Sequence, residues 1–246
     1  MNKSSSLVFL TGLLCDERIW RAVTKELSAS FNTSIVAFKG CHSIGQMAEK
    51  VMAHIARATL APCVVVGHSM GGRVALEVYK QAPQIISALG LFNTGVHPVN
   101  ESEKRIRQKL VDSATSEGLG SLATSWLYPM VNQANHHKQE LMTSLVQMLQ
   151  TYSLEEYLWQ IEALLTRPNA QEVLELIDVP TLLLSGKHDT HSPPAQHLQM
   201  QKYIKNSQFV NIENAGHMAP VECPNEVAEI ISSWILDTQN KDTGCL

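Results

Sequence analysis

The chain has 246 residues, of which 44% are hydrophobic and 17% charged, and its formal net charge is −4 at pH 7. This length suits one sizeable core rather than two full domains. The slightly acidic balance excludes the basic surface that nucleic acid or anionic lipid would require. No apolar run approaches the roughly 20 residues of a membrane-spanning helix. We therefore expect a globular protein that has neither a nucleic acid nor a membrane as its partner.

The N-terminal stretch MNKSSSLVFLTGLLCDERIW allows two interpretations. A lysine, a polar patch, an apolar run and then Cys15 have the outline of a lipoprotein export signal. However, Thr11 and Gly12 interrupt the apolar run, and Leu14 precedes the cysteine where a small residue is expected. The run at 7–10 fits better as a buried strand that leads into a functional loop. On this interpretation the protein is cytoplasmic.

The cysteines predict neither a disulfide framework nor a zinc site. They are odd in number, scattered, and never spaced as C-x-x-C. The five are Cys15, Cys41, Cys63, Cys223 and Cys245. Free thiols in a reducing compartment are the simpler interpretation.

Strand-like and helix-like runs alternate along the first part of the chain. Short apolar or β-branched runs predict strands, and apolar residues at helical spacing predict amphipathic helices. In chain order we expect a strand at 7–10, a helix at 16–31, a strand at 34–38, a helix at 43–60, a strand at 63–66, a helix at 73–82 and a strand at 86–92. This order predicts an α/β fold with a parallel sheet between two layers of helices, buried on both sides.

The alternation stops after Gly95, and only helix-like patterns occur in 97–178. Strand signals then return: a strand at 179–186, a helix near 193–204, a strand at 208–216 and a helix at 224–236. The polar tail from Asp237 is expected to fray. We therefore divide the chain into an α/β core, 1–96 and 179–246, and a helical insertion, 97–178.

The third predicted strand runs directly into GHSMGG, residues 67–72, and a helix follows. This matches G-x-S-x-G on a strand-to-helix turn, which is so sharp that the residues two before and two after the serine must be small. The serine, Ser69, is then strained and exposed above the sheet. A phosphate-binding loop would need G-x-x-x-x-G-K-[ST] or G-x-G-x-x-G, and neither is present. The motif therefore predicts that Ser69 is a nucleophile.

A serine nucleophile needs a base, and the base needs an orienting carboxylate. Asp189 follows the predicted strand TLLLSG, and His217 follows the last predicted strand. Both come after the carboxyl ends of strands, as Ser69 does, and in a parallel sheet those ends share one edge. The strand before the insertion ends in FNT, so the other common position for the acid holds no carboxylate. Asp189 and His217 are therefore the predicted acid and base.

Other histidines near these residues suggest a metal only weakly. His188 and His191 flank Asp189, but the sequence offers no third convergent ligand. His68 precedes the serine and should point away from the position of the base. We therefore predict no metal and no cofactor.

The tetrahedral intermediate of acyl transfer needs N–H donors for its oxyanion. One is the backbone N–H of Met70, the residue after the nucleophile. The loop after the first strand supplies the other, and Leu13, directly after Gly12, is the predicted donor.

Four blocks of the chain carry a resemblance to a known family: LVFLTG-LL, GHSMGGRVALE, LLLSGKHDTHSPP and NAGHMAPVECPNEV. Over nearly its whole length the chain resembles the α/β-hydrolase superfamily, in the group of small esterases and carbon–carbon bond hydrolases. The resemblance implies an α/β-hydrolase fold in which 97–178 is a helical lid. Two features depart from the family pattern. Thr11-Gly12 replaces the common His-Gly, and the usual N-terminal hairpin is missing, which leaves a sheet of about six strands.

The lid implied by this resemblance covers Ser69 and forms the substrate pocket. Candidate lining residues are Trp126, Leu127, Tyr128, Met130, Tyr157, Leu158 and Trp159. We expect more than half of them to pack between lid and core instead. Their apolar character predicts a small, mostly apolar substrate. No basic cluster for a phosphate or coenzyme A stands out, although Arg105, Arg107 and Lys109 lie in this block.

Together these residues predict a serine hydrolase that cleaves a small carboxylic ester, as a monomer or a dimer. One alternative is hydrolysis of a carbon–carbon bond, thioester, lactone or amide by the same three residues. The other is a small-molecule receptor that keeps the three residues but signals through its lid. Turnover of a simple ester separates the receptor from the enzymes.

Overall fold

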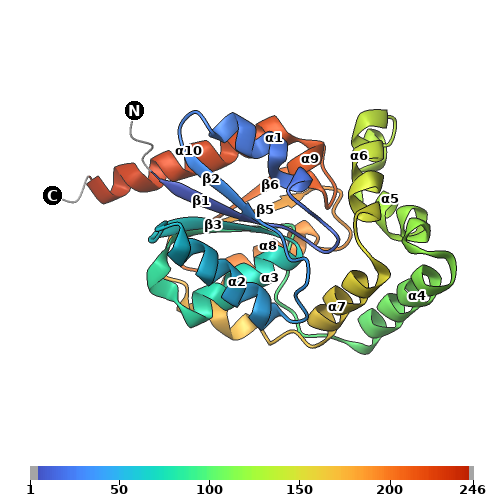
Figure 1. Ribbon diagram of the computed structural model, residues 1–246. Helices are drawn as coiled ribbons and strands as arrows, with labels where there is room; N and C mark the ends of the chain where they lie inside the picture. The colour runs from blue at the N-terminus through green and yellow to red at the C-terminus, as the bar shows by residue number, and fades with distance from the viewer. Residues whose placement is uncertain (1–4, 244–246) are drawn as a thin grey trace.

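The computed structural model describes residues 5–243 and confirms an α/β fold built on a six-stranded parallel sheet (Figure 1). The strands are β1 (Ser6–Leu10), β2 (Asn32–Val36), β3 (Cys63–His68), β4 (Ile86–Phe92), β5 (Thr181–Gly186) and β6 (Ser207–Ile212). Their order in the sheet is β2-β1-β3-β4-β5-β6, and each neighbouring pair is parallel. No antiparallel hairpin occurs within residues 5–243, in agreement with the sequence.

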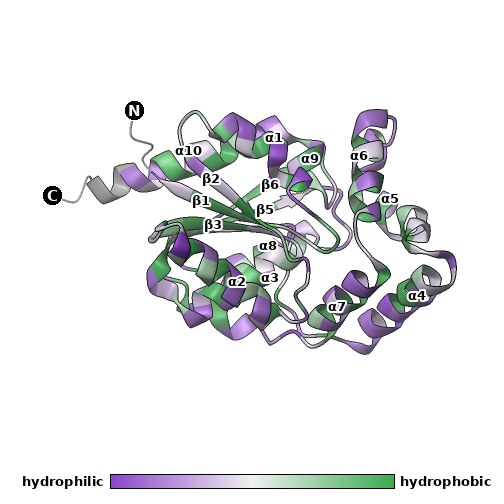
Figure 2. Ribbon diagram, in the orientation of Figure 1, coloured by the Kyte–Doolittle hydropathy of each residue, from purple (hydrophilic) through white to green (hydrophobic). Residues whose placement is uncertain are grey.

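The sheet is the centre of the core. The four inner strands are buried along almost their whole length, whereas the edge strands β2 and β6 are largely half-exposed. Burial on both faces explains why the inner strands read as continuous apolar runs. In Figure 2 these strands carry hydrophobic colour, while much of the surface of α2 and α4 is hydrophilic.

Helices cover both faces of the sheet (Figure 1). On one face α1 (Arg18–Leu27) packs against α10 (Pro224–Thr243) and the short α9 (Ala219–Glu222), and on the other α2 (Ile44–Arg57) packs against α3 (Met70–Gln81). α8 (Pro194–Gln201) packs against β5 and β6. The described part of α10 continues past Asp237, where the sequence predicted fraying.

Between β4 and β5 the chain leaves the sheet. It forms α4 (Glu101–Glu117), α5 (Tyr128–Met130), α6 (Gln139–Gln150) and α7 (Leu154–Leu165), joined by short 3-10 and π turns. We call residues 97–178 the helical segment. It is described throughout and contains no strand. It lies at the end of the sheet where the strands terminate (Figure 1), so its side chains can reach residues that follow the strands.

The described cysteines, Cys15, Cys41, Cys63 and Cys223, are free thiols, and Cys245 lies outside the described residues. Burial raises the pKa of Cys15 and that of Cys63 to about 12, so neither is a reactive thiolate. Within residues 5–243, no helix has both the length and the apolar character to cross a bilayer.

Candidate active site

Ser69 occupies the turn between β3 and α3 in a conformation that few residues adopt, with φ 55° and ψ −116°. Its N–H donates to the carbonyl of Phe92 at 2.9 Å, and its own carbonyl accepts from the hydroxyl of Thr94 at 2.7 Å. A Cβ on Gly67 would overlap the carbonyl of Gly71. One on Gly71 would lie 2.6 Å from two carbonyl oxygens at the end of β1. Only glycines therefore permit this sharp turn.

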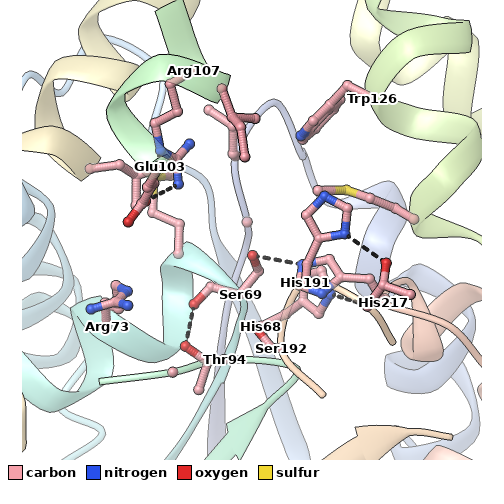
Figure 3. Close-up of a pocket in the computed structure, with 18 of the residues that line it drawn as sticks. His68, Ser69, Arg73, Thr94, Glu103, Arg107, Trp126, His191, Ser192 and His217 are labelled. Atoms are coloured by element: carbon pink, nitrogen blue, oxygen red, sulfur yellow. Dashed lines mark hydrogen bonds and ion pairs between the residues drawn. The ribbon is translucent and has the colours of Figure 1, made fainter. Parts of the chain in front are cut away.

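Ser69, His217 and Asp189 form one continuous hydrogen-bonded chain. His217 Nε2 lies 2.9 Å from Ser69 Oγ, an interaction drawn in Figure 3. His217 Nδ1 lies 2.9 Å and 3.0 Å from the two carboxylate oxygens of Asp189. The structure thus brings together the three residues that follow β3, β5 and β6 in the sequence. The arrangement has the geometry in which a histidine can take a proton from a serine.

Asp189 is buried but held by several donors. Its Oδ1 accepts from the backbone N–H groups of His191 and Ser192, both at 2.8 Å, and its Oδ2 accepts from the Asn93 amide at 2.9 Å. Burial by itself would raise the pKa of Asp189. The charge and hydrogen bond of His217, with these other donors, instead hold that pKa well below its usual range. Asp189 is therefore ionised and fixes the orientation of the imidazole.

Asn93 fills the place where the sequence showed no carboxylate after β4. It has a positive φ of 48°, and its amide donates to the backbone carbonyl of Gly216 at 3.2 Å as well as to Asp189. Sequence reasoning excluded Asn93 as an acid but missed it as a donor to the acid. Because Asn93 follows a central strand of the sheet, its position could have indicated this role.

The two histidines nearest to His217 are uncharged at neutral pH. Burial, followed by the charge of His217, lowers the pKa of His68 to about 3 and that of His191 to about 4. His68 Nε2 lies 2.8 Å from the carbonyl of His217, and His68 lines the same cavity as Ser69. Within residues 5–243, no three His, Cys, Asp or Glu side chains are grouped to hold a metal ion.

Two backbone N–H groups near Ser69 are available to a ligand. Leu13 and Met70 both line the cavity described below, as does Ser69. Neither N–H donates a hydrogen bond to the part of the chain that the structure describes. Both are therefore free to bind an oxygen that develops negative charge.

The loop that carries Leu13 is held by the helical segment rather than by Thr11. The Thr11 hydroxyl is buried and has no hydrogen-bond partner among the described residues. Instead, the Leu14 N–H donates to the side chain of Gln160 in α7 at 2.8 Å, and the Tyr152 hydroxyl donates to the Cys15 carbonyl at 2.7 Å. These contacts join residues 146 and 137 positions apart, so no local pattern could have predicted them.

A buried carboxylate, that of Glu222, joins the loop of His217 to the helical segment. It accepts four hydrogen bonds, at 2.8 to 3.2 Å, from the N–H groups of Gly216, Met218 and Asn132 and from the amide of Asn135. The N–H of His217 itself donates to the Met130 carbonyl at 2.7 Å. The position of His217 therefore depends on residues 130–135 as well as on β6.

A cavity of about 430 Å³ opens at Ser69. Of the lining residues expected from the sequence, the cavity contains Trp126 and Met130. The other five, Leu127, Tyr128, Tyr157, Leu158 and Trp159, do not line it. Tyr128 packs edge-on against His136, Tyr157 is buried elsewhere, and Trp159 stacks on His42 at a ring distance of 4.1 Å. Most of the seven candidate lining residues thus pack against other parts of the protein, as expected.

The cavity is also less apolar than the sequence indicated. Arg73, Glu103 and Arg107 form part of its wall (Figure 3), whereas Arg105 and Lys109 do not line it. Glu103 makes ion pairs with Arg107 at 2.8 Å and with Arg167 at 2.6 Å. No basic cluster stood out in the sequence, but the structure gathers Arg73, Arg107 and Arg167 around Glu103. The cluster escaped notice because its members come from α3, α4 and the end of α7.

Comparison with known proteins agrees with this fold. The mouse (Mus musculus) protein named sn-1-specific diacylglycerol lipase ABHD11 is 24% identical over 200 residues, which cover 77% of this chain and 64% of that protein. Two solved structures are similar. An esterase from Thermogutta terrifontis with malate bound has a TM-score of 0.88 at 24% identity, covering 96% of this chain and 91% of its own. The enol-lactonase from Burkholderia xenovorans LB400 has a TM-score of 0.85 at 20% identity, covering 94% and 91%.

At these identities the two solved structures establish a shared fold. The family model for the alpha/beta hydrolase family matches residues 7–230, which include the helical segment and all six strands except Ser6, the first residue of β1. The chain therefore belongs to the alpha/beta hydrolase family of enzymes.

Proposed function

We propose that this protein is a serine hydrolase that cleaves a carboxylic ester, with Ser69 as nucleophile, His217 as general base and acid, and Asp189 as the residue that orients it. The observation that carries the proposal is the unbroken chain of hydrogen bonds at 2.9 Å from Ser69 Oγ through His217 to Asp189. The strained turn at Ser69 and the cavity in front of it support the same roles.

In the first half of the reaction, Ser69 Oγ bonds to the ester carbonyl carbon while its proton passes to His217 Nε2. The carbonyl electron pair moves onto the oxygen, which the N–H groups of Leu13 and Met70 stabilise. The bond to the alkoxy oxygen then breaks, and His217 returns the proton to the departing alcohol. The acyl group remains on Ser69.

In the second half, water replaces the alcohol. His217 takes one proton from the water as its oxygen bonds to the acyl carbon, and the oxyanion forms again on the same two donors. The bond between the acyl carbon and Ser69 Oγ then breaks. Oγ recovers its proton from His217, and the carboxylic acid leaves.

The names of similar proteins suggest a wider range of bonds that this protein could hydrolyse than a simple ester. The similar proteins include one named a diacylglycerol lipase and one named an enol-lactonase, and a lactone is an internal ester that the same steps would open. The same three residues could also act on carbon–carbon, thioester or amide bonds. We further propose that the helical segment acts as a lid, which the lining residues Trp126 and Met130 support.

Labelling and turnover together test the proposal. A fluorophosphonate should label Ser69, as located by peptide mass spectrometry, and Ser69→Ala should lose both labelling and hydrolysis of short p-nitrophenyl esters. Labelling of another serine, or undiminished turnover by Ser69→Ala, would exclude this mechanism. A receptor of the same fold would show at most one burst of product per protein molecule rather than continued turnover.

A further inference from the structure

The cavity wall around Glu103 holds more positive than negative charge. Arg107 and Arg167 both pair with the Glu103 carboxylate. Arg73 lies in the same cluster, and no carboxylate of the described residues comes within ion-pair distance of it. Three guanidinium groups thus face one carboxylate in a protein whose formal net charge is −4. The excess of positive charge is therefore confined to this part of the cavity wall.

Glu103 is already engaged by the other two arginines. Its Oε1 accepts from Arg107 Nε at 2.9 Å and from Arg167 Nη1 at 2.7 Å, and its Oε2 accepts from Arg167 Nη2 at 2.6 Å. Burial would raise the pKa of Glu103, but its hydrogen bonds and ion pairs with Arg167 and Arg107 hold it at about 2. Glu103 is therefore a carboxylate that these two arginines already share.

Arg73 is the arginine of this cluster that has no carboxylate partner among the described residues. It lines the cavity, is only 9% exposed, and donates from Nη2 to the His97 carbonyl at 3.3 Å. Its Nη1 has no hydrogen-bond partner in the described chain. A buried, unpaired guanidinium opposes folding, because the lost hydration is not replaced. An anionic ligand bound to Arg73 would compensate for this lost hydration.

Arg107 offers a second donor to the same space. It borders the cavity and directs Nε and Nη2 at Glu103, so its Nη1 has no acceptor among the described residues. In Figure 3 Arg73 and Arg107 lie on one side of Ser69, and His191 and His217 lie on the other. A ligand that reaches Ser69 therefore meets the imidazoles on one side and the guanidinium groups on the other.

A purely structural role accounts for Arg167 but not for Arg73. Arg167 does not line the cavity, and it ties the end of α7 to α4 through Glu103. Holding α3 in the same way would require a carboxylate opposite Arg73, and none is present in the described chain. Arg73 and Arg167 share the His97 carbonyl, at 3.3 Å and 3.2 Å, but the charge of Arg73 has no counter-charge within ion-pair distance in the described chain.

We propose that the cavity accepts esters with a second, ionised carboxylate, which Arg73 and Arg107 bind while Ser69 attacks the ester carbonyl. This inference rests on the proposed function for the role of Ser69, and it narrows the substrate class from carboxylic esters in general to half-esters of dicarboxylic acids and related anions. The planar, forked guanidinium group suits a carboxylate, with which it forms two parallel hydrogen bonds.

Binding tests the proposal without turnover. The Ser69→Ala protein is titrated by calorimetry with monomethyl glutarate, with the neutral analogue methyl pentanoate and with inorganic phosphate. The half-ester should bind at least about tenfold more tightly than either of the others, and less tightly as salt increases. Equal binding of methyl pentanoate would overturn the proposal. Tighter binding of phosphate would assign the arginines to a phosphoryl group instead.

Variants then locate the binding. In the same background Arg107→Gln should weaken half-ester binding by roughly tenfold or more. Arg105→Gln is the matched control, because it removes the same charge from the exposed face of the same helix, α4, and should leave the affinity unchanged. Arg73→Gln should resemble Arg107→Gln, and Arg73→Lys guards against misfolding by keeping the charge. Equal affinity in the Arg105 and Arg107 variants would overturn the assignment.

Turnover separates this inference from the proposed function. With Ser69 intact, the ratio of kcat/KM for mono-p-nitrophenyl glutarate over p-nitrophenyl pentanoate should be about ten or more, and Arg107→Gln should bring it near one. Equal turnover of both esters, with no selective binding, would refute the anion site and leave the hydrolase mechanism standing. Selective binding without turnover of either ester would refute the mechanism and leave the anion site standing.

Discussion

In the α/β core the hydrogen-bonded residues lie on the turns and loops that follow strands, Ser69 after β3, Asp189 after β5 and His217 after β6. In the helical segment, Glu103, Arg107 and Gln160 reach the site from within helices, through contacts with distant parts of the chain. The sheet brings its residues together by topology, because parallel strands end at one edge. The helical segment does so only by packing. Changes in the core should therefore abolish the reaction, and changes in the helical segment should tune it.

The largest loss of activity should come from a substitution in the core, Asp189→Asn. The amide places an NH₂ donor where one carboxylate oxygen was, which favours the wrong tautomer of His217 and removes the negative charge beside it. The kcat for ester hydrolysis should therefore fall by about 10⁴-fold. Steady-state kinetics measure the change. Asp178→Asn is a matched control, because Asp178 bonds to the Tyr79 hydroxyl away from the cavity, and its kcat should be unaltered. A loss below tenfold in Asp189→Asn would contradict the role assigned to the carboxylate.

An intermediate effect is expected where the helical segment supports the loop of Leu13. Gln160→Ala removes the acceptor of the Leu14 N–H, so the loop loosens and kcat should fall roughly tenfold to a hundredfold, while KM changes little. Gln150→Ala, at the exposed end of α6, should change neither constant. If KM rose instead and kcat held, Gln160 would serve substrate binding rather than the position of Leu13.

Acid should weaken the helical segment through Glu103. Its pKa is lowered from 4.5 to about 2, so its ion pairs stabilise the folded protein above about pH 4.5. That contribution is lost as the pH falls through about 2. Urea unfolding of wild type and Glu103→Gln should therefore differ most near pH 7 and converge towards pH 2. A difference that stayed constant over this range would show that packing, not charge, accounts for it.

The smallest effect should come from Trp159→Ala. Trp159 is half-buried and stacks on His42 away from the cavity. Its loss should lower the free energy of unfolding by about 0.5–1.5 kcal/mol for the ring pair, together with the lost burial of part of the indole, and should leave the acyl-chain preference intact. Trp126→Ala, by contrast, enlarges the cavity and should shift the preference towards longer chains. A series of p-nitrophenyl esters measures both. Equal shifts of the chain-length preference in the two variants would contradict the finding that Trp126, and not Trp159, lines the cavity.

The sequence was sufficient to predict the sheet, the helical segment and the three hydrogen-bonded residues, because each depends on a local pattern and on the edge that parallel strands share. It failed for residues whose surroundings are assembled from distant segments. Tyr157 and Trp159 are aromatic residues of the kind that line pockets, but they pack elsewhere. Arg73 lies in a predicted helix, and nothing in the sequence around it indicates a binding role. Gln160 carries no motif at all, since its partner lies 146 positions away.

The buried carboxylate of Glu222 has a consequence for how the protein opens. It binds the N–H groups of Asn132, Gly216 and Met218, and Asn132 lies 90 positions before it in the chain. Asn132 bonds to one carboxylate oxygen and Gly216 and Met218 to the other, so opening of either stretch leaves this buried carboxylate short of donors and destabilises the contacts of the other stretch. We therefore expect these three amide hydrogens to exchange with solvent at similar rates, as one cooperative unit in which the loop of His217 opens together with residues 130–135.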